Sequence, residues 1–143
     1  MTRSFTLVEL IVVIGAAILI AAFTMPVGFR FFQTQRLDET TSDILVTLRR
    51  ANNQAISQKN DSGFGVKFLP GSYVLFQGDS YALRVVSYDE DFDLPVGISV
   101  IGIDEVNFSK LNGTPSFTGV FSVHSGNDSQ NVSINKYGKI EAE

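Results

Sequence analysis

The sequence predicts an α+β fold in which one long N-terminal helix packs on an antiparallel β-sheet domain. Two patterns lead to this prediction. Apolar residues recur at helical spacing up to about residue 57, and after Gly63 they alternate with polar residues at the period of a strand. The 143 residues are enough for one domain with a hydrophobic core and too few for two.

The first half of the predicted helix is almost wholly apolar. From Leu10 to Phe23 every residue is apolar or glycine, and the apolar run extends from Phe5 to Phe29. About 20 residues of helix cross the hydrocarbon core of a bilayer. Residues 5–29 are therefore predicted to form a transmembrane helix. We expect a kink at Pro26, because proline lacks the N–H that a helix interior needs.

The second half, residues 30–60, is predicted to continue the helix as an amphipathic segment. Its apolar residues fall at spacings that place them on one face: Leu37, Ile44, Leu48, Ala51 and Ala55. We expect this face to pack on the sheet. The helix should end near the stretch "QKND", where asparagine and aspartate favour a turn.

Residues 61–143 are predicted to form a β-rich domain. Short runs of β-branched and aromatic residues are separated by Gly, Asp, Asn and Pro turns. The predicted strands are "FGVKF", "YVLFQ", "YALRVVSYD", "ISVIGIDEVNFSK" with a bulge at Gly102, "FTGVFSVHS", and a hairpin in "NVSINKYGKIEA". Five phenylalanines have the periodicity of core residues: Phe64, Phe68, Phe76, Phe117 and Phe121.

The composition excludes several kinds of chemistry. There is no cysteine, so a disulfide framework, a thiol nucleophile and a cysteine-based zinc site are impossible. The single histidine, His124, has no second histidine to form a metal cluster, and its place in a strand predicts that it points outward. Hydrolase, phosphate-loop and metalloprotease motifs are absent from the sequence. We expect a protein that is not an enzyme and needs no cofactor.

Charge is distributed unevenly along the chain. The first 59 residues carry six cations and four anions, a net charge of +2, whereas the remainder carries five cations and eleven anions, a net charge of −6. Binding to phosphate requires clustered lysine and arginine. Nucleic acid is therefore not expected to be the main partner of the acidic β-rich domain.

The apolar N-terminus is compatible with three interpretations. A cleaved secretory signal would be shorter and would end in a small-residue cleavage site, which is not evident here. A plain signal anchor would have to hold Glu9 near the headgroups, because a carboxylate at the bilayer centre costs about 3 kcal/mol. The third interpretation rests on the stretch "FTLVELIVVIGAAILIAAFTMP", in which Phe5, Glu9 and Pro26 have a fixed spacing.

This stretch closely resembles the N-terminal signature of type IV prepilins. The resemblance implies that a membrane peptidase cleaves between Ser4 and Phe5, removing residues 1–4 as a leader, and that the new amino group of Phe5 is then methylated. Family members usually have glycine before the cut, where this chain has Ser4. The resemblance gives Pro26 the role of kinking the helix.

Glu9 would be the fifth residue of the mature chain. The family resemblance implies that its carboxylate pairs with the N-terminal ammonium of a neighbouring subunit. Such a pairing would set the register of a helical assembly, as a buried polar residue does in a coiled coil. Glu9 is therefore predicted to be an assembly residue.

Later motifs resemble the H-type pseudopilin and FimT-like minor pilin group. They are "RRANNQA" at the end of the helix, "GVKF", "YVLFQG" and the closing "INKYGKI". The resemblance implies a minor pilin or pseudopilin that assembles into, or primes, a filament of a type IV pilus, type II secretion or competence system. Its partners would be other subunits, the prepilin peptidase and the inner-membrane assembly platform. It would cross the inner membrane once, with its C-terminal domain periplasmic or extracellular.

Two further predictions concern binding. The alternative function is a membrane-anchored module that captures DNA or another surface ligand, although the C-terminal lysines are matched by glutamates. The stretch "YDEDFDLP" gathers four carboxylates whose oxygens could bind calcium: Asp89, Glu90, Asp91 and Asp93. No EF-hand pattern accompanies them, so we predict a solvated acidic loop and no metal site, with these four as the calcium candidate to test.

Overall fold

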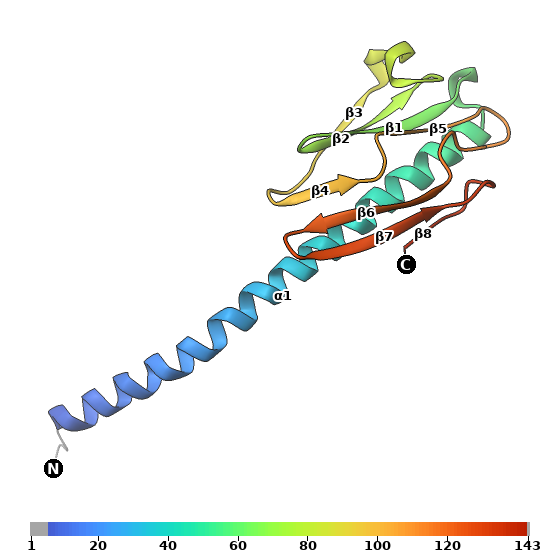
Figure 1. The fold of residues 1–143 in the computed structure, drawn as a ribbon. Helices are drawn as coiled ribbons and strands as arrows, with labels where there is room; N and C mark the ends of the chain where they lie inside the picture. Colours follow the sequence, from blue (N-terminus) through green and yellow to red (C-terminus); the bar gives the residue numbers. More distant parts are fainter. Residues whose placement is uncertain (1–5, 143) are drawn as a thin grey trace. The chain divides into compact units, whose positions relative to one another are not determined.

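The structure, a computed structural model, describes residues 6–142, and it describes their side chains except at residues 23–30. The chain divides into two compact units, Met1–Thr34 and Gln35–Glu143. Helix α1, Leu7–Ile56, contributes to both (Figure 1).

In the first unit, α1 exposes large apolar side chains along its described length. They include Leu7, Ile11, Ile18 and Phe31. No helix among the described residues is long and apolar enough to cross a membrane.

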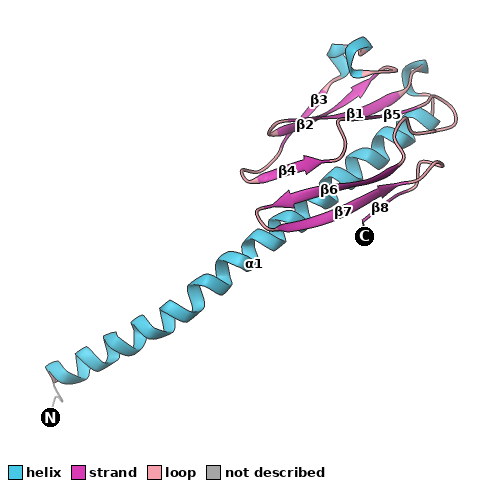
Figure 2. Cartoon of the chain, in the orientation of Figure 1, coloured by secondary structure: helices cyan, strands magenta, loops and turns pink. Residues whose placement is uncertain are grey.

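The second unit combines the rest of α1 with two antiparallel four-stranded sheets, shown in Figure 2. Sheet A has the order β3-β2-β1-β5 and sheet B the order β4-β6-β7-β8. The strands of sheet A are β1 (Phe64–Leu69), β2 (Ser72–Gln77), β3 (Glu90–Asp93) and β5 (Glu105–Phe108). Those of sheet B are β4 (Ile98–Ile101), β6 (Gly119–Ser125), β7 (Asp128–Ile134) and β8 (Ile140–Ala142).

One hydrophobic core joins the helix to both sheets. The five predicted stripe residues of α1 are all at most 2% exposed, and they share a cluster with side chains of all the strands of both sheets. Two arginines extend this attachment. Arg49 donates to the Ile140 carbonyl of β8 at 2.9 Å, and Arg50 pairs with Glu90 of β3 at 2.6 Å. The predicted α+β architecture is therefore confirmed.

Tyr73 of β2 lies in this core at 3% exposure. Burial raises the pKa of its hydroxyl, and the charge of Asp43 acts in the same direction. A hydrogen bond with Thr47 partly offsets both effects. Neutral Tyr73 is thus the form that the folded protein favours.

The chain leaves α1 through strained backbone. Gln58 has a φ of 53°, and Asn60 and Asp61 within the 3₁₀ turn η1 (Lys59–Asp61) are also left-handed, at 52° and 58°. The Asn60 amide donates to the Gln77 side chain at 2.7 Å, which fixes this turn on β2. The Leu111 N–H donates to the Ala55 carbonyl at 3.1 Å and satisfies one carbonyl at the helix end.

The prediction of a strand in "YALRVVSYD" was wrong. This stretch forms two 3₁₀ turns, η2 (Tyr81–Leu83) and η3 (Val86–Tyr88). The reason lies in pairing: one edge of β2 is occupied by β1 and the other by β3, so no edge of β2 remains for it. Strand β3 itself comes from the acidic stretch that was predicted to be a loop.

The long strand predicted in "ISVIGIDEVNFSK" is in fact two strands in different sheets. The break falls at Gly102, whose φ of 95° is favourable for glycine and not for residues with a Cβ. Strand β4 before it joins sheet B, and β5 after it joins sheet A. The predicted bulge is therefore the crossing between sheets. The other predicted strands and the closing hairpin are confirmed as β1, β2, β6, β7 and β8.

Candidate functional site

The first turn of α1 carries Glu9, an exposed residue. Its backbone N–H donates to the Thr6 hydroxyl at 3.3 Å, so Thr6 caps the helix. Threonine followed three residues later by glutamate is the spacing of a capping box. Glu9 also lies where the helix dipole favours negative charge. Sequence reasoning overlooked this local role, although "TLVE" contains its signature.

The other N-terminal site residues are only partly covered. Ser4 and Phe5, the predicted cleavage pair, lie outside the described residues. Pro26 falls within the continuous helical backbone of α1, and its side chain lies outside the description. Cleavage, methylation and a kink therefore stay predictions.

The four carboxylates of the calcium candidate do not converge. Asp89 accepts from Arg84 at 2.7 Å, and Glu90 accepts from both terminal guanidinium nitrogens of Arg50 at 2.7 and 2.6 Å. Asp91 and Asp93 are exposed on β3. Alternate residues of a strand point to opposite faces, which separates Glu90 from these two. Within the part of the chain that the structure describes, no group of three or more acidic, histidine or cysteine side chains is placed to hold a metal ion.

The C-terminal hairpin bears on the alternative of DNA capture. Lys139 pairs with Glu141 at 2.6 Å, and the Lys136 ammonium lies 4.9 Å from the centre of the Tyr137 ring. His124, predicted to point outward, is half-buried on β6 and lies opposite Ser99 and Ser129. The described residues of this hairpin present no cluster of cations of the kind that phosphate binding requires.

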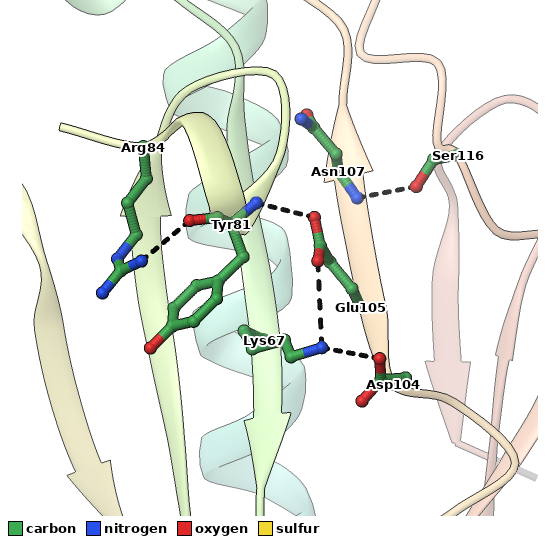
Figure 3. A network of polar contacts seen from close by, with 7 residues as sticks. All are labelled: Lys67, Tyr81, Arg84, Asp104, Glu105, Asn107 and Ser116. Atoms are coloured by element: carbon green, nitrogen blue, oxygen red, sulfur yellow. Dashed lines mark hydrogen bonds and ion pairs between the residues drawn. The ribbon is translucent and has the colours of Figure 1, made fainter. Parts of the chain in front are cut away.

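A polar network that the sequence did not predict holds residues 81–88 against sheet A (Figure 3). Arg84 is its centre: its Nε donates to Asp89 at 2.7 Å, its Nη1 donates to the Tyr81 carbonyl at 2.8 Å, and its guanidinium lies 3.7 Å from the centre of the Tyr81 ring. The hydrogen bond to Asp89 raises the pKa of Arg84. Arg84 therefore stays charged and links both ends of the segment.

The network is anchored on the neighbouring strands. The Tyr81 N–H donates to the Glu105 carboxylate at 2.9 Å, and Lys67 pairs with Asp104 at 2.6 Å and with Glu105 at 3.9 Å. The Val85 N–H donates to the Gln77 carbonyl at 2.9 Å. Residues 81–88 are consequently fixed to β1, β2 and β5.

Apolar packing supports the same attachment. Phe76 of β2 points away from the central core, yet it is fully buried because the Tyr81 ring packs edge-on against it, with centroids 5.7 Å apart. The opposite residue on β1 is Gly65. A Cβ there would lie 2.4 Å from Phe76 Cζ, so only glycine leaves room for this ring. Residues 81–88 therefore cover the outer face of sheet A.

Comparisons with known proteins add no identification. No protein-family model, no curated protein and no solved structure matches this chain.

Proposed function

We propose that this chain is a minor pilin or pseudopilin, a structural subunit that joins or primes a filament of a type IV pilus, type II secretion or competence system. The observation that carries the proposal is the spacing of Phe5, Glu9 and Pro26 in the N-terminal apolar run. The fold is consistent with it, because a long helix followed by antiparallel sheets is the arrangement that the resemblance implies.

In this proposal the chain is a substrate of processing enzymes and performs no catalysis. A prepilin peptidase removes residues 1–4, and Phe5 is methylated. Before assembly, residues 5–29 anchor the chain in the inner membrane, and the β-rich domain lies outside the cytoplasm. The inner-membrane platform then transfers the subunit into the filament beside other subunits.

The capping geometry sharpens the role proposed for Glu9. Cleavage would create an ammonium at Phe5, next to the positive end of α1. These two positive charges make a carboxylate in the first turn favourable, whether it belongs to the same subunit or to a neighbour. Glu9 would thus offset a repulsion that arises only in the processed chain.

Mass spectrometry of the N-terminus tests the proposal directly. We expect the full chain, isolated from cells with a prepilin peptidase, to begin with methylated Phe5. Strains without the peptidase, which should retain Met1, provide the control. An intact Met1 in the presence of the peptidase, or a cut near Ala22, would refute the proposal.

Two substitutions of Glu9 separate capping from charge pairing. Glu9→Gln preserves the capping-box spacing, since glutamine also serves at this position, and removes the charge. Glu9→Ala removes both. If charge pairing sets register, both variants are processed and both are lost from sheared filaments. Normal incorporation of Glu9→Gln would show that the carboxylate charge is not required.

A further inference from the structure

Asn112 and Gly113 form the only asparagine–glycine pair in the sequence. An asparagine side chain can lose ammonia by reaction with the backbone nitrogen of the next residue. Glycine permits this reaction best, because it has no side chain to obstruct the approach. Each of the other seven asparagines precedes a residue that has a side chain. The sequence therefore singles out Asn112 as a site of deamidation.

The reaction needs only solvent water as a co-reactant. A bond forms between the Gly113 nitrogen and the side-chain carbonyl carbon of Asn112. The bond from that carbon to the amide nitrogen breaks, and ammonia leaves with the proton that the Gly113 nitrogen gives up. Water then opens the resulting cyclic imide at either carbonyl, which yields aspartate or isoaspartate at position 112. No oxidation or reduction takes place.

In the folded chain, the attacking nitrogen is held in the loop of residues 109–114, which follows β5. The Gly113 N–H donates to the Ser109 carbonyl at 2.9 Å, and Gly113 is buried, whereas Asn112 is exposed. A Cβ at position 113 would collide with Asn52 Oδ1, so Gly113 fits closely against α1. The nitrogen must lose its proton to react, and here that proton is hydrogen-bonded within the protein. Folding should therefore slow the reaction.

The loop is strained and depends on its contact with the end of α1. Leu111 has a φ of 75°, and the Asn112 N–H donates across it to the Lys110 carbonyl at 3.0 Å. This is the strained form of the γ-turn, which persists only where its surroundings hold it. The Leu111 N–H in turn donates to the Ala55 carbonyl at the end of the helix. Loss of that attachment would let the loop relax and free the Gly113 N–H.

Either product would oppose the closed loop. Aspartate at position 112 places a negative charge beside the C-terminal end of α1, where the helix dipole favours positive charge. Isoaspartate adds a methylene group to the backbone directly before Gly113, which has no room even for a Cβ. The reaction would thus keep open the loop whose opening permitted it.

We propose that Asn112 is a deamidation site that the folded chain keeps closed, and that its reaction detaches residues 109–114 from α1. The site responds to transient opening at the end of the helix. The change is permanent because the ammonia is lost to solvent. The inference goes beyond the proposed function, since it requires neither processing at Phe5 nor assembly.

Peptide mass spectrometry of the full chain measures the reaction. The chain is incubated in detergent at mildly alkaline pH, either folded or unfolded in guanidinium chloride, and conversion of Asn112 is followed over time. Asn127 is the control within the same molecule, since it is also exposed in a turn but precedes Asp128. In the unfolded chain, Asn112 should convert faster than Asn127 and yield both aspartate and isoaspartate. Folding should slow this conversion about tenfold or more.

Asn52→Ala tests whether α1 keeps the site closed. The substitution removes the side chain against which Gly113 fits, so conversion of Asn112 in the folded chain should become faster. Asn53→Ala is the matched control, because Asn53 is exposed on the same helix, and it should leave the rate unchanged.

Asn112→Asp tests the effect of the product on the loop. Cleavage by trypsin after Lys110 should become about threefold faster than in the wild-type chain. Asn127→Asp makes the same charge change in another turn and should leave this cleavage unchanged.

Three results would overturn the proposal. Conversion of Asn112 no faster than that of Asn127 in the unfolded chain would mean that the pair is not reactive. Equal conversion of Asn112 in the folded and unfolded chains would mean that the loop does not close the site. Unchanged cleavage after Lys110 in the Asn112→Asp chain would mean that the product does not detach the loop.

Discussion

Gly65→Ala should destabilise the β-rich unit by overpacking the outer face of sheet A. The added Cβ would lie 2.4 and 2.9 Å from two ring atoms of Phe76 and 2.7 Å from the Val106 carbonyl oxygen. Carbon atoms in contact are ordinarily about 3.5–4.0 Å apart, so the ring must move by about 1 Å. Phe76 is fully buried under Tyr81 and has no free space to enter.

The expected cost lies at the upper end of the range for overpacking, about 3 kcal/mol. This corresponds to a fall in Tm of roughly 10 °C for a unit of this size. Urea unfolding of the full chain in detergent measures it, with tyrosine fluorescence as the signal because the chain has four tyrosines and no tryptophan. Gly15→Ala is the matched control: nothing lies within 4 Å of its Cβ position, and alanine favours a helix by about 1 kcal/mol.

A double mutant identifies the side chain responsible. Phe76→Leu removes the ring atoms that the Cβ added by Gly65→Ala would meet, and it leaves the Val106 carbonyl in place. The summed cost of Gly65→Ala and Phe76→Leu should therefore exceed the cost of the double mutant by about 1 kcal/mol. Additive costs, or a Gly65→Ala cost below about 0.5 kcal/mol, would show that Phe76 does not lie over β1.

Three further predictions concern the end of α1, Tyr73 and Arg84. Gln58→Gly should stabilise the chain by about 1 kcal/mol in urea unfolding, because Gln58 has a φ of 53°, whereas Gln54→Gly within α1 should destabilise it by a similar amount. Burial raises the pKa of the Tyr73 hydroxyl, so the stability that the neutral hydroxyl contributes is complete below about pH 10 and decreases as the pH rises further. In unfolding curves measured at several pH values, Tyr73→Phe should therefore lose less stability above about pH 10 than the wild-type chain. Arg84→Lys keeps the positive charge but loses the planar guanidinium that donates to both Asp89 and the Tyr81 carbonyl. Limited proteolysis within residues 81–88 should therefore become faster. An unchanged cleavage rate would mean that the guanidinium does not hold this segment.

The long helix and its buried face could be predicted because their signal is local. Leu37, Ile44 and Leu48 recur at the period of an α-helix, and any sheet that packs on α1 must meet that face. The same holds for β1 and β2, where alternation and the "LPGS" turn specify a hairpin. In these elements, local preference and tertiary packing agree.

Residues 81–93 could not be predicted for the opposite reason. Val85 and Val86 favour a strand, and the carboxylates that follow disfavour one. The outcome depends on which segment takes the free edge of β2, and β3 takes it with Asp91 and Asp93 directed outward. Charged side chains are a usual protection of an edge strand, so the acidic residues suit β3 there. That competition is decided by contacts distant in sequence.

The uneven charge of the chain acquires a structural meaning from these placements. Its net charge is +2 up to Lys59 and −6 beyond, and the structure directs Asp91 and Asp93 outward while Glu90 is neutralised by Arg50. Copies in equivalent positions would set acidic β-rich units side by side, which electrostatics disfavours. Added salt, which screens exposed charges within about 10 Å at 0.1 M, should weaken that repulsion.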